Sequence, residues 1–379
     1  MPVLVYTSFG EVPEDVRAHF SYPNQPKFLL SFDWFSLLFA TSLHQTLSPR
    51  IYVLVDDRRE PMGALFCGVS RGGSVRRLLS LTNFYSLEYA PSVVRGAPDQ
   101  DTIVRQLIAH IATERPRWHA IRFSFLNLDT SGSQALSDHL RRAGFGVSPF
   151  FQYENWFLPL GGETFQTYFA GRPSQLRNTI TRKQKRLEKH HDFSIKVIRQ
   201  AGQVGELETA VQDFVAVYNA SWKQAEPFPS FIPTLAATCA SLGVLRLGVC
   251  HVGGKPAAGQ LWITGGGKAI IYKLAYDEQY ADLGVGSVLS REMFRIAIDE
   301  DHVDEIDYGV GSEAYKKDWM TSVRRLDGVL ALNRRTATGA VLAAVEAARS
   351  AMRRGRAPGP RPQTGVVGPG RDPAAVEPR

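Results

Sequence analysis

Three apolar runs joined by glycine turns, followed by a glycine-led helix, constrain the fold of this chain more than any other feature. Short glycine turns between apolar runs are typical of an antiparallel meander. The runs are Val244–His251, Ala258–Thr264 and Ala269–Tyr276. An amphipathic helix then extends from Gly284 to Asp299 and leads to a strand at Glu305–Tyr308. A glycine-rich helix start between two strands leaves backbone N–H groups free at the positive end of the helix dipole, which predicts a phosphate site.

The first half of the chain follows a similar plan. A hairpin is predicted at Ile51–Asp57 and Gly63–Ser70, and Asp101 is placed to cap a helix that ends at Thr113. Further strands are expected at 78–81, 120–126 and 150–160, and a further helix at 133–143. The repeated element order suggests an internal duplication. We therefore expect an α/β fold with mixed α+β sheets, divided into domains at residues 1–160 and 161–335.

Composition excludes several classes of protein. The 379 residues have ordinary apolar (44%) and charged (21%) contents, and no run approaches the about 20 apolar residues of a membrane span. Cys67, Cys239 and Cys250 are scattered, which argues against a disulfide framework or a metal site and favours the cytoplasm. Part of the net charge of +7 lies in residues 352–379, a basic Pro/Gly-rich tail that we expect to be disordered.

A polar cluster follows the strand at Glu305–Tyr308. Ligands of α/β sheets usually bind at strand ends, so Asp307 is a candidate general base or orienting group, and Lys316 a candidate for neutralising an anion or oxyanion. The residues leave open an alternative, in which Asp307 and Lys316 form an ion pair that caps the sheet while Tyr315 and Trp319 belong to the core.

Two polar residues interrupt the apolar meander. Strict alternation places Lys273 on the same face as Ile271 and Ala275, opposite Tyr272, Leu274 and Tyr276. A lysine in such a strand either reaches the edge of the sheet or faces a polar cleft. Gln260 poses the same alternative one strand earlier.

A basic helix is predicted at Arg172–Lys189, with seven basic residues and one acidic residue. It is interpreted as a solvated surface, a site for an anionic substrate or cofactor phosphate, or a nucleic-acid groove. Few aromatic residues are interleaved with the cations, which argues against stacking on single strands. The sequence has no HExxH, P-loop, GxSxG or post-strand GxGxxG motif, which disfavours zinc hydrolases, NTPases and serine esterases.

The ordered set of motifs over residues 160–330 resembles the BioF2-like acetyltransferase domain of the GNAT superfamily. This domain is found in CelD-type proteins and is related to the Fem aminoacyltransferases. The resemblance rests on LRNTITRKQKRLEK, VYNASW, AAGQLWIT with AIIYKLAYD, and QYADLGVGSVL with DYGVGSEAYKKDW. It implies two tandem GNAT-like acyl-CoA N-acyltransferase folds.

The resemblance also implies roles for single residues. Asp307 and Lys316 match the Asp and Lys of the D-x-G…YK-x-W signature and become the catalytic pair. The coenzyme A pyrophosphate is assigned to Leu283, Gly284, Val285, Gly286, Ser287 and Val288, although the sequence lacks the common small-Pro-Gly lead to this helix. Substrate contacts are assigned to Lys273, Gln260, Tyr315, Trp222 and Arg177, and no metal is expected.

The sequence thus predicts a cytoplasmic acyltransferase of the GNAT type. Its donor is expected to be acetyl-CoA or a longer acyl-CoA, and its acceptor an amine or hydroxyl of a small molecule, sugar or lipid precursor. Two alternatives stay open: a Fem-like aminoacyltransferase using aminoacyl-tRNA, and a catalytically silent GNAT-like protein that binds polyanions. The long helical arm typical of the Fem branch has no counterpart here, which favours acyl-CoA and disfavours a nucleic-acid partner.

Overall fold

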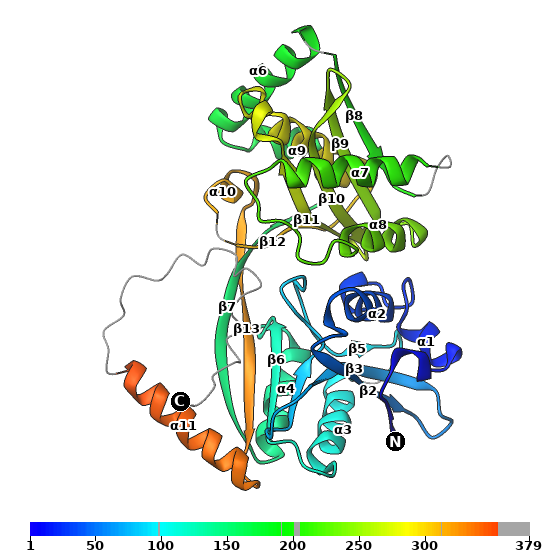
Figure 1. The fold of residues 1–379 in the computed structure, drawn as a ribbon, viewed down its shortest axis with the longest axis vertical. Coiled ribbons are helices and arrows are strands. Elements are labelled where there is room, and N and C mark those ends of the chain that lie inside the picture. The colour runs from blue at the N-terminus through cyan, green and yellow to red at the C-terminus, as the bar shows by residue number, and fades with distance from the viewer. Residues whose placement is uncertain (98, 191, 201–204, 312, 355–379) are drawn as a thin grey trace. The chain divides into compact units, whose positions relative to one another are not determined.

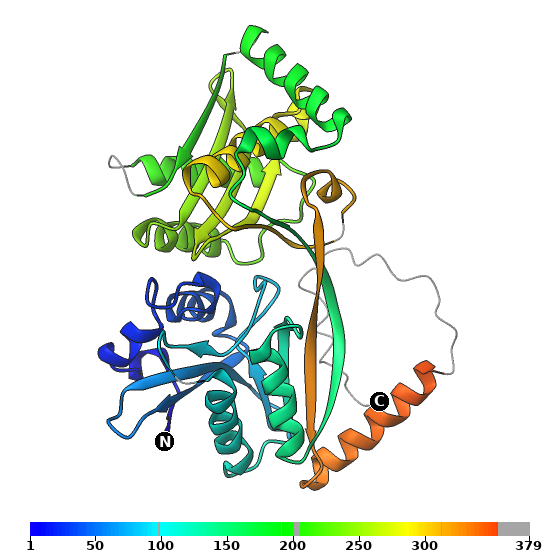
Figure 2. The same cartoon turned by 180° about the vertical axis from the view of Figure 1, so that it is seen from behind.

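The computed structural model describes residues 1–97, 99–190, 192–200, 205–311 and 313–354. The chain forms two compact units, each a mixed sheet covered by helices (Figures 1 and 2). The described part of the first unit comprises residues 1–154 and 325–354, and that of the second comprises residues 155–324.

The first unit has the strand order β1-β2-β3-β4-β6-β13-β7, with the short β5 beside β3. Its meander β2-β3-β4 is antiparallel, and β4 pairs with β6 in parallel. Its longer elements are β1 (Val3–Tyr6), α1 (Glu14–Phe20), α2 (Phe32–Leu38), β2 (Leu47–Val55), β3 (Pro61–Ser70), β4 (Arg77–Ser80), β5 (Ser92–Val93), α3 (Gln100–Thr113), β6 (Ala120–Leu126), α4 (Ser131–Arg142), β7 (Phe145–Pro159), β13 (Ser322–Asn333) and α11 (Ala337–Arg354).

The second unit repeats this plan with the order β7-β12-β11-β10-β9-β8. Its meander β9-β10-β11 is antiparallel, and β11 pairs with β12 in parallel. Its elements are α5 (Phe165–Ala170), α6 (Ser174–His190), β8 (Phe193–Ile198), α7 (Glu206–Asn219), α8 (Phe231–Ser241), β9 (Leu245–Val252), β10 (Lys255–Gly265), β11 (Lys268–Tyr276), a 3₁₀ segment η4 (Glu278–Leu283), α9 (Val285–Arg295), η5 (Ile296–Glu300), β12 (Glu305–Val310) and α10 (Lys316–Trp319).

Two long strands carry the chain from one unit to the other, and they move the expected domain limits. The last residues of β7 pair with β12 of the second unit, and the last residues of β13 pair with β6 of the first. The division therefore falls after residue 154 instead of 160, and residues 325–335 belong with the first half of the sequence. Each unit takes its final strand from the other half of the chain.

Several expectations about single elements need correction. The N-cap of α3 is Asp99 without a side-chain cap bond, and Asp101 instead contacts His139 of α4 at 2.8 Å. Met352 lies within α11, so the expected disordered tail begins in a helix, while residues 355–379 lie outside the described part of the chain. The sequence interpretation also missed β1, α1, α2, α8, β8, β13 and α11.

Helices cover both faces of the second sheet and fix its α9 in place. Helices α7 and α8 lie on one face, and α9 with α6 on the other (Figures 1 and 2). The apolar stripe of α9 contains Val285, Val288, Leu289, Met293 and Phe294, all buried in one core with Trp262 of β10. Burial of this stripe anchors the first turn of α9 above β10 and β11.

A β-bulge in β11 overturns the expected orientation of Lys273. Leu261 of β10 pairs with Lys273 and Trp262 pairs with Ile271, so Tyr272 is the extra residue of β11. Ile271 packs into the core under α9, whereas Tyr272 contacts Phe231 of α8 and Lys273 lies over Tyr218 of α7. Because the bulge breaks the alternation, Tyr272 and Lys273 share one face, opposite Ile271.

Candidate functional site

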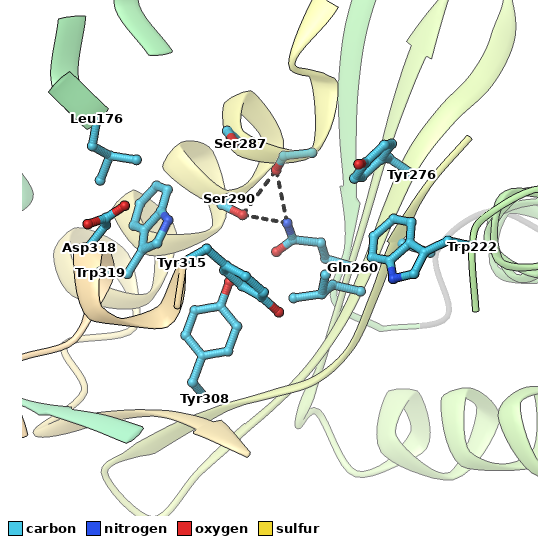
Figure 3. Close-up of a pocket in the computed structure, with 13 residues that line it drawn as sticks. Leu176, Trp222, Gln260, Tyr276, Ser287, Ser290, Tyr308, Tyr315, Asp318 and Trp319 are labelled. Atoms are coloured by element: carbon cyan, nitrogen blue, oxygen red, sulfur yellow. Dashed lines mark hydrogen bonds between the residues drawn. The ribbon is translucent and has the colours of Figure 1, made fainter. Parts of the chain in front are cut away.

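A cavity of about 380 Å³ opens where β11 and β12 separate. Their parallel pairing ends at Ile270 and Asp307, although β11 continues to Tyr276 and β12 to Val310. Side chains from both strands, from β10, from α9 and from the segment around α10 converge on this gap (Figure 3). The lining residues are Leu176, Trp222, Gln260, Leu274, Ala275, Tyr276, Gly286, Ser287, Ser290, Tyr308, Tyr315, Asp318 and Trp319.

The first turn of α9 forms one wall of the cavity. Gly284 is the N-cap, with φ of 67°, a left-handed conformation that favours glycine. It supplies no side-chain cap, and the first N–H groups of an α-helix have no intrahelical partner. Gly286 and the exposed Ser287 line the cavity. These two residues of the predicted pyrophosphate set are therefore placed to meet a ligand.

The other predicted pyrophosphate residues contribute backbone or core contacts. The side chains of Val285 and Val288 are buried, and that of Leu283 packs against the same core. Lys183 of α6 donates to the carbonyl of Asp282, and its side chain lies against Gly284. A cation of α6 thus lies beside the N-terminus of α9, a contact that the sequence interpretation did not single out.

Gln260 connects the cavity wall to α9. Its Nε2 donates to Ser290 Oγ at 2.7 Å and to the carbonyl of Gly286 at 3.2 Å, as the dashed lines in Figure 3 show. Its Oε1 accepts from Trp262 Nε1 at 2.9 Å. Gln260 lines the cavity, and its amide also fixes the first turn of α9 on β10.

Asp307 is buried in an ionic network rather than exposed to the cavity. Its Oδ2 lies 2.7 Å from Lys268 Nζ and 2.5 Å from Arg324, while its Oδ1 accepts from Asn155 at 2.6 Å and from the N–H of Gly309 at 2.8 Å. Burial alone would raise the pKa of this carboxyl, but the charges of Lys268 and Arg324, with the hydrogen bonds, lower it to about 2. These contacts favour the positioning of β12 over proton transfer by Asp307.

The ammonium group of Lys316 likewise donates its hydrogen bonds to other groups of the protein. It is 3% exposed, and its Nζ lies 2.6 Å from the carbonyl of Val310 and 2.9 Å from the carboxylate of Glu313. The alternative ion pair between Asp307 and Lys316 is therefore absent, because each side chain has its own partners. Burial lowers the pKa of Lys316, against the opposing effect of Glu313. Lys316 holds the segment that carries Tyr315 to the cavity.

Two tyrosines face the cavity beside these charged residues. The rings of Tyr308 and Tyr315 lie 5.7 Å apart, nearly perpendicular (Figure 3). Burial raises the pKa of both hydroxyls, and for Tyr308 the neighbouring Tyr315 adds to the effect. Both therefore stay protonated at neutral pH and are proton donors. Tyr315 was a predicted substrate contact, whereas Tyr308 was not assigned a role.

The remaining predicted substrate residues separate into two groups. Trp222 lines the cavity, and its ring lies 4.6 Å from that of Tyr276. Lys273 pairs with Glu226 at 2.6 Å on the α7 side of the sheet. Arg177 does not line the cavity, because its Nε donates to the carbonyl of Arg172 within the α6 region. Its neighbour Leu176 reaches the cavity instead.

The outward face of α6 is cationic. Its exposed residues include Arg182, Lys185, Arg186 and Lys189, while Ile180 and Leu187 are buried against the second unit. This confirms a helix that docks by one apolar face and leaves most of its cations in solvent.

Eight lining residues were absent from the predicted site: Leu176, Leu274, Ala275, Tyr276, Ser290, Tyr308, Asp318 and Trp319. Most are apolar or aromatic, and such residues carry no chemical signal in a sequence. Ser290 lies one turn after Gly286, so helical spacing from the glycines could have identified it.

The described residues contain no group of three or more His, Cys, Asp or Glu side chains that could hold a metal ion. Among them, no helix has the length and apolar content needed to cross a bilayer. All three cysteines are buried and unpaired.

Residues 174–317 match the family model described as an acetyltransferase (GNAT) domain. This match spans α6 to α10 and includes the meander, the bulge and the α9 N-terminus. No curated protein matches the chain.

Solved structures share the fold over most of the chain at low sequence identity. FemX is 11% identical with a TM-score of 0.56, covering 87% of this chain and 97% of that one. L-PGS from Bacillus licheniformis is 11% identical with a TM-score of 0.53, covering 88% and 96%. A conserved protein of unknown function from Bacteroides thetaiotaomicron is 12% identical with a TM-score of 0.54, covering 87% and 100%. Residues 174–317 are therefore similar to a GNAT acetyltransferase domain, and the chain, with its two GNAT-like units, shares the fold of FemX and L-PGS.

Proposed function

We propose that the second unit transfers an acyl group from acetyl-CoA or a longer acyl-CoA to an amine or hydroxyl of a small molecule, sugar or lipid precursor. The observation that carries this proposal is the cavity at the separation of β11 and β12, with the glycine-led N-terminus of α9 as its wall. The pantetheine arm and thioester of an acyl-CoA need a slot between strands, and its pyrophosphate needs backbone hydrogen-bond donors. This site offers both.

The donor fits the site in two parts. The pyrophosphate would accept from the backbone N–H groups of the first turn of α9, where the helix dipole favours an anion. Glycine at position 286 keeps this space open, because the Cβ of any other residue there would lie only 3.2 Å from the ring of Tyr276. The pantetheine arm would follow the edge of β11 beyond Ile270, where β12 no longer pairs with it.

Direct attack of the acceptor on the thioester is the chemistry proposed for this slot. The nucleophile forms the new bond to the carbonyl carbon, the C–S bond breaks, and the coenzyme A thiolate leaves. Backbone N–H groups of β11 at the bulge would polarise the carbonyl. Tyr308 or Tyr315, both protonated, would give its proton to the leaving thiolate and regain one from the attacking amine or hydroxyl, directly or through water, so that the transfer leaves the enzyme unchanged. We assign Asp307 and Lys316 to holding β12 and the Tyr315 segment in place.

We place the donor in the second unit only. The helix of the first unit that corresponds to α9 is α3, which also lies between two parallel strands. Asp99 and Asp101 flank its first residue. Carboxylates at the positive end of a helix dipole repel a phosphate, so we propose that the first unit supports the fold and binds no donor. Three free, buried cysteines suit a reducing compartment such as the cytoplasm.

Binding of acyl-CoA tests the proposal. Thermal unfolding of the full chain would be followed with acetyl-CoA, a series of longer acyl-CoA molecules, and coenzyme A. Saturating ligand that binds only the folded state raises the midpoint, by about 2.7 kcal/mol of stability at 100 times Kd. The expected result is stabilisation by at least one acyl-CoA. No stabilisation by any member, with the chain shown to be folded, would refute the proposal.

A second candidate function is aminoacyl transfer from aminoacyl-tRNA, as in a Fem-like enzyme. The exposed cations of α6 favour it, because a row of Arg and Lys side chains can bind phosphates of RNA. Salt dependence separates the candidates. Binding of tRNA to several cations should weaken steeply between 50 and 200 mM salt, by about 10³-fold or more for six or more phosphate contacts, whereas acyl-CoA binding should persist.

A further inference from the structure

Three lysine ammonium groups lie around the gap between β11 and β12, and two of them, those of Lys223 and Lys273, lie against Tyr218 of α7. Lys273 belongs to β11, Lys316 follows β12, and Lys223 lies in the loop after α7. Lys273 has Glu226 as its carboxylate partner at 2.6 Å, and Lys316 has Glu313 at 2.9 Å. Among the described residues, no carboxylate pairs with the ammonium of Lys223.

The side chain of Lys223 lies among aromatic rings at the edge of the cavity. Its Nζ is 5.7 Å from the ring centroid of Tyr218 and 5.8 Å from that of Trp222. Trp222 itself lines the cavity and contacts Tyr276, the last residue of β11. These rings place the ammonium next to the cavity wall and keep it partly out of water.

The charged groups that act on Lys223 come from both sides of the gap between β11 and β12. Burial and the charges of Lys273 and Lys316 together lower the pKa of Lys223 to about 8, against the opposing effects of Glu313 and Glu226. One of these two cations belongs to each side of the separated strands. Of these three ammonium groups, that of Lys223 is the one without a carboxylate partner among the described residues, and it is half-buried, where charge interactions are stronger than in water.

This inference rests on the proposed acyl-transfer function: we infer that Lys223 is the anion-binding residue of the acceptor site. It would take a carboxylate or phosphate of an acceptor whose amine or hydroxyl enters the gap opposite α9. The opposite faces separate the two anions: α9 would hold the donor phosphates, and Lys223 the acceptor. An anion there completes the charge balance and forms a charge-assisted hydrogen bond with the ammonium.

Matched acceptor pairs test this assignment with acetyl-CoA as donor. Phosphoethanolamine is compared with ethanolamine, and β-alanine with β-alaninamide, by the rate of coenzyme A thiol release. The first pair isolates a phosphate and the second a carboxylate. The expected result is that one charged member has a kcat/KM about tenfold or more above its neutral partner, the range of a hydrogen bond to a charged group.

Variants of the full chain identify the residue responsible. Lys223→Met should remove the preference by lowering kcat/KM for the charged member while leaving the neutral member within about twofold, and Lys223→Arg should retain the preference. Lys196→Met removes an exposed lysine of β8 and serves as the matched control, with no change expected. The Kd for acetyl-CoA should be the same in all four proteins.

Several outcomes would overturn the inference. They are equal or better use of the neutral members, an equal loss for both members in Lys223→Met, or a weakened acetyl-CoA affinity in that variant. The inference would also be overturned if no charged acceptor is acetylated and none stabilises the complex of the protein with acetyl-CoA. Because acetyl-CoA binding is measured separately, these results differ from failure of the proposed function, in which acyl-CoA does not bind at all.

Discussion

Substitution of Ser287 by glutamate separates the folding role of the α9 N-terminus from its proposed ligand role. Ser287 is the third residue of α9, exposed, and lines the cavity. A carboxylate in the first turn of a helix is favourable by about 0.3–1 kcal/mol. Ser287→Glu should therefore fold as well as the parent, or slightly better, which thermal unfolding without ligand would measure.

The same carboxylate should strongly weaken acetyl-CoA binding. At about 6 Å and an effective dielectric constant of about 20, two unit negative charges repel by about 3 kcal/mol. This corresponds to a Kd raised by about 100-fold, which isothermal titration calorimetry would resolve. The control Ser287→Ala loses only a hydroxyl, for which about 0.5–1.5 kcal/mol is expected. A folded Ser287→Glu protein with the affinity of the parent would refute the placement of the pyrophosphate at α9.

Three further predictions concern the network, the tyrosines and the packing of the second unit. Asp307→Asn removes one of the two carboxylates that Lys268 and Arg324 contact and leaves them with Glu305, so the free energy of unfolding in denaturant should fall by about 2 kcal/mol, and a loss below about 1 kcal/mol would contradict this role. Since the pKa of Asp307 in the fold is about 2, below its ordinary 3.8, its stabilisation is present above pH about 4 and is lost as the pH falls through about 2; the parent but not Asp307→Asn should show this loss. Tyr315→Phe should lower kcat by about 100-fold if this hydroxyl is the proton donor, with the Kd for acetyl-CoA unchanged, whereas an unaltered kcat would assign proton donation elsewhere. Gly259→Ala places a Cβ 2.7 Å from the Phe214 ring and should cost about 1–3 kcal/mol, while Gly161→Ala, which meets no atom within 4 Å, should unfold like the parent.

The meander and the glycine-led helix could be predicted because local sequence determines both. Glycine turns close the hairpins of β9, β10 and β11, and the apolar stripe of α9 has helical spacing. Gly286, Ser287 and Gln260 could be placed at the site for the same reason. The aromatic lining could not, since Tyr276 and Tyr308 resemble core residues until two parallel strands are known to separate.

The partners of Asp307 depend on the tertiary fold. They come from β7, β11 and β13, far apart in the sequence, so the sequence suggested only a nearby lysine as partner. The predicted orientation of Lys273 was wrong because one extra residue, Tyr272, shifts the register of β11. Lys223 carried no signal at all, because a single lysine in a polar loop becomes distinctive only beside Lys273 and Lys316.

In a crystal structure of the full chain with coenzyme A, we expect the pyrophosphate against the backbone N–H groups of Val285, Gly286 and Ser287. We expect the pantetheine arm along β11 beyond Ile270 and the thiol between Tyr308 and Tyr315. Coenzyme A bound at any other place, or a β11–β12 gap that stays empty at saturating coenzyme A, would contradict this placement.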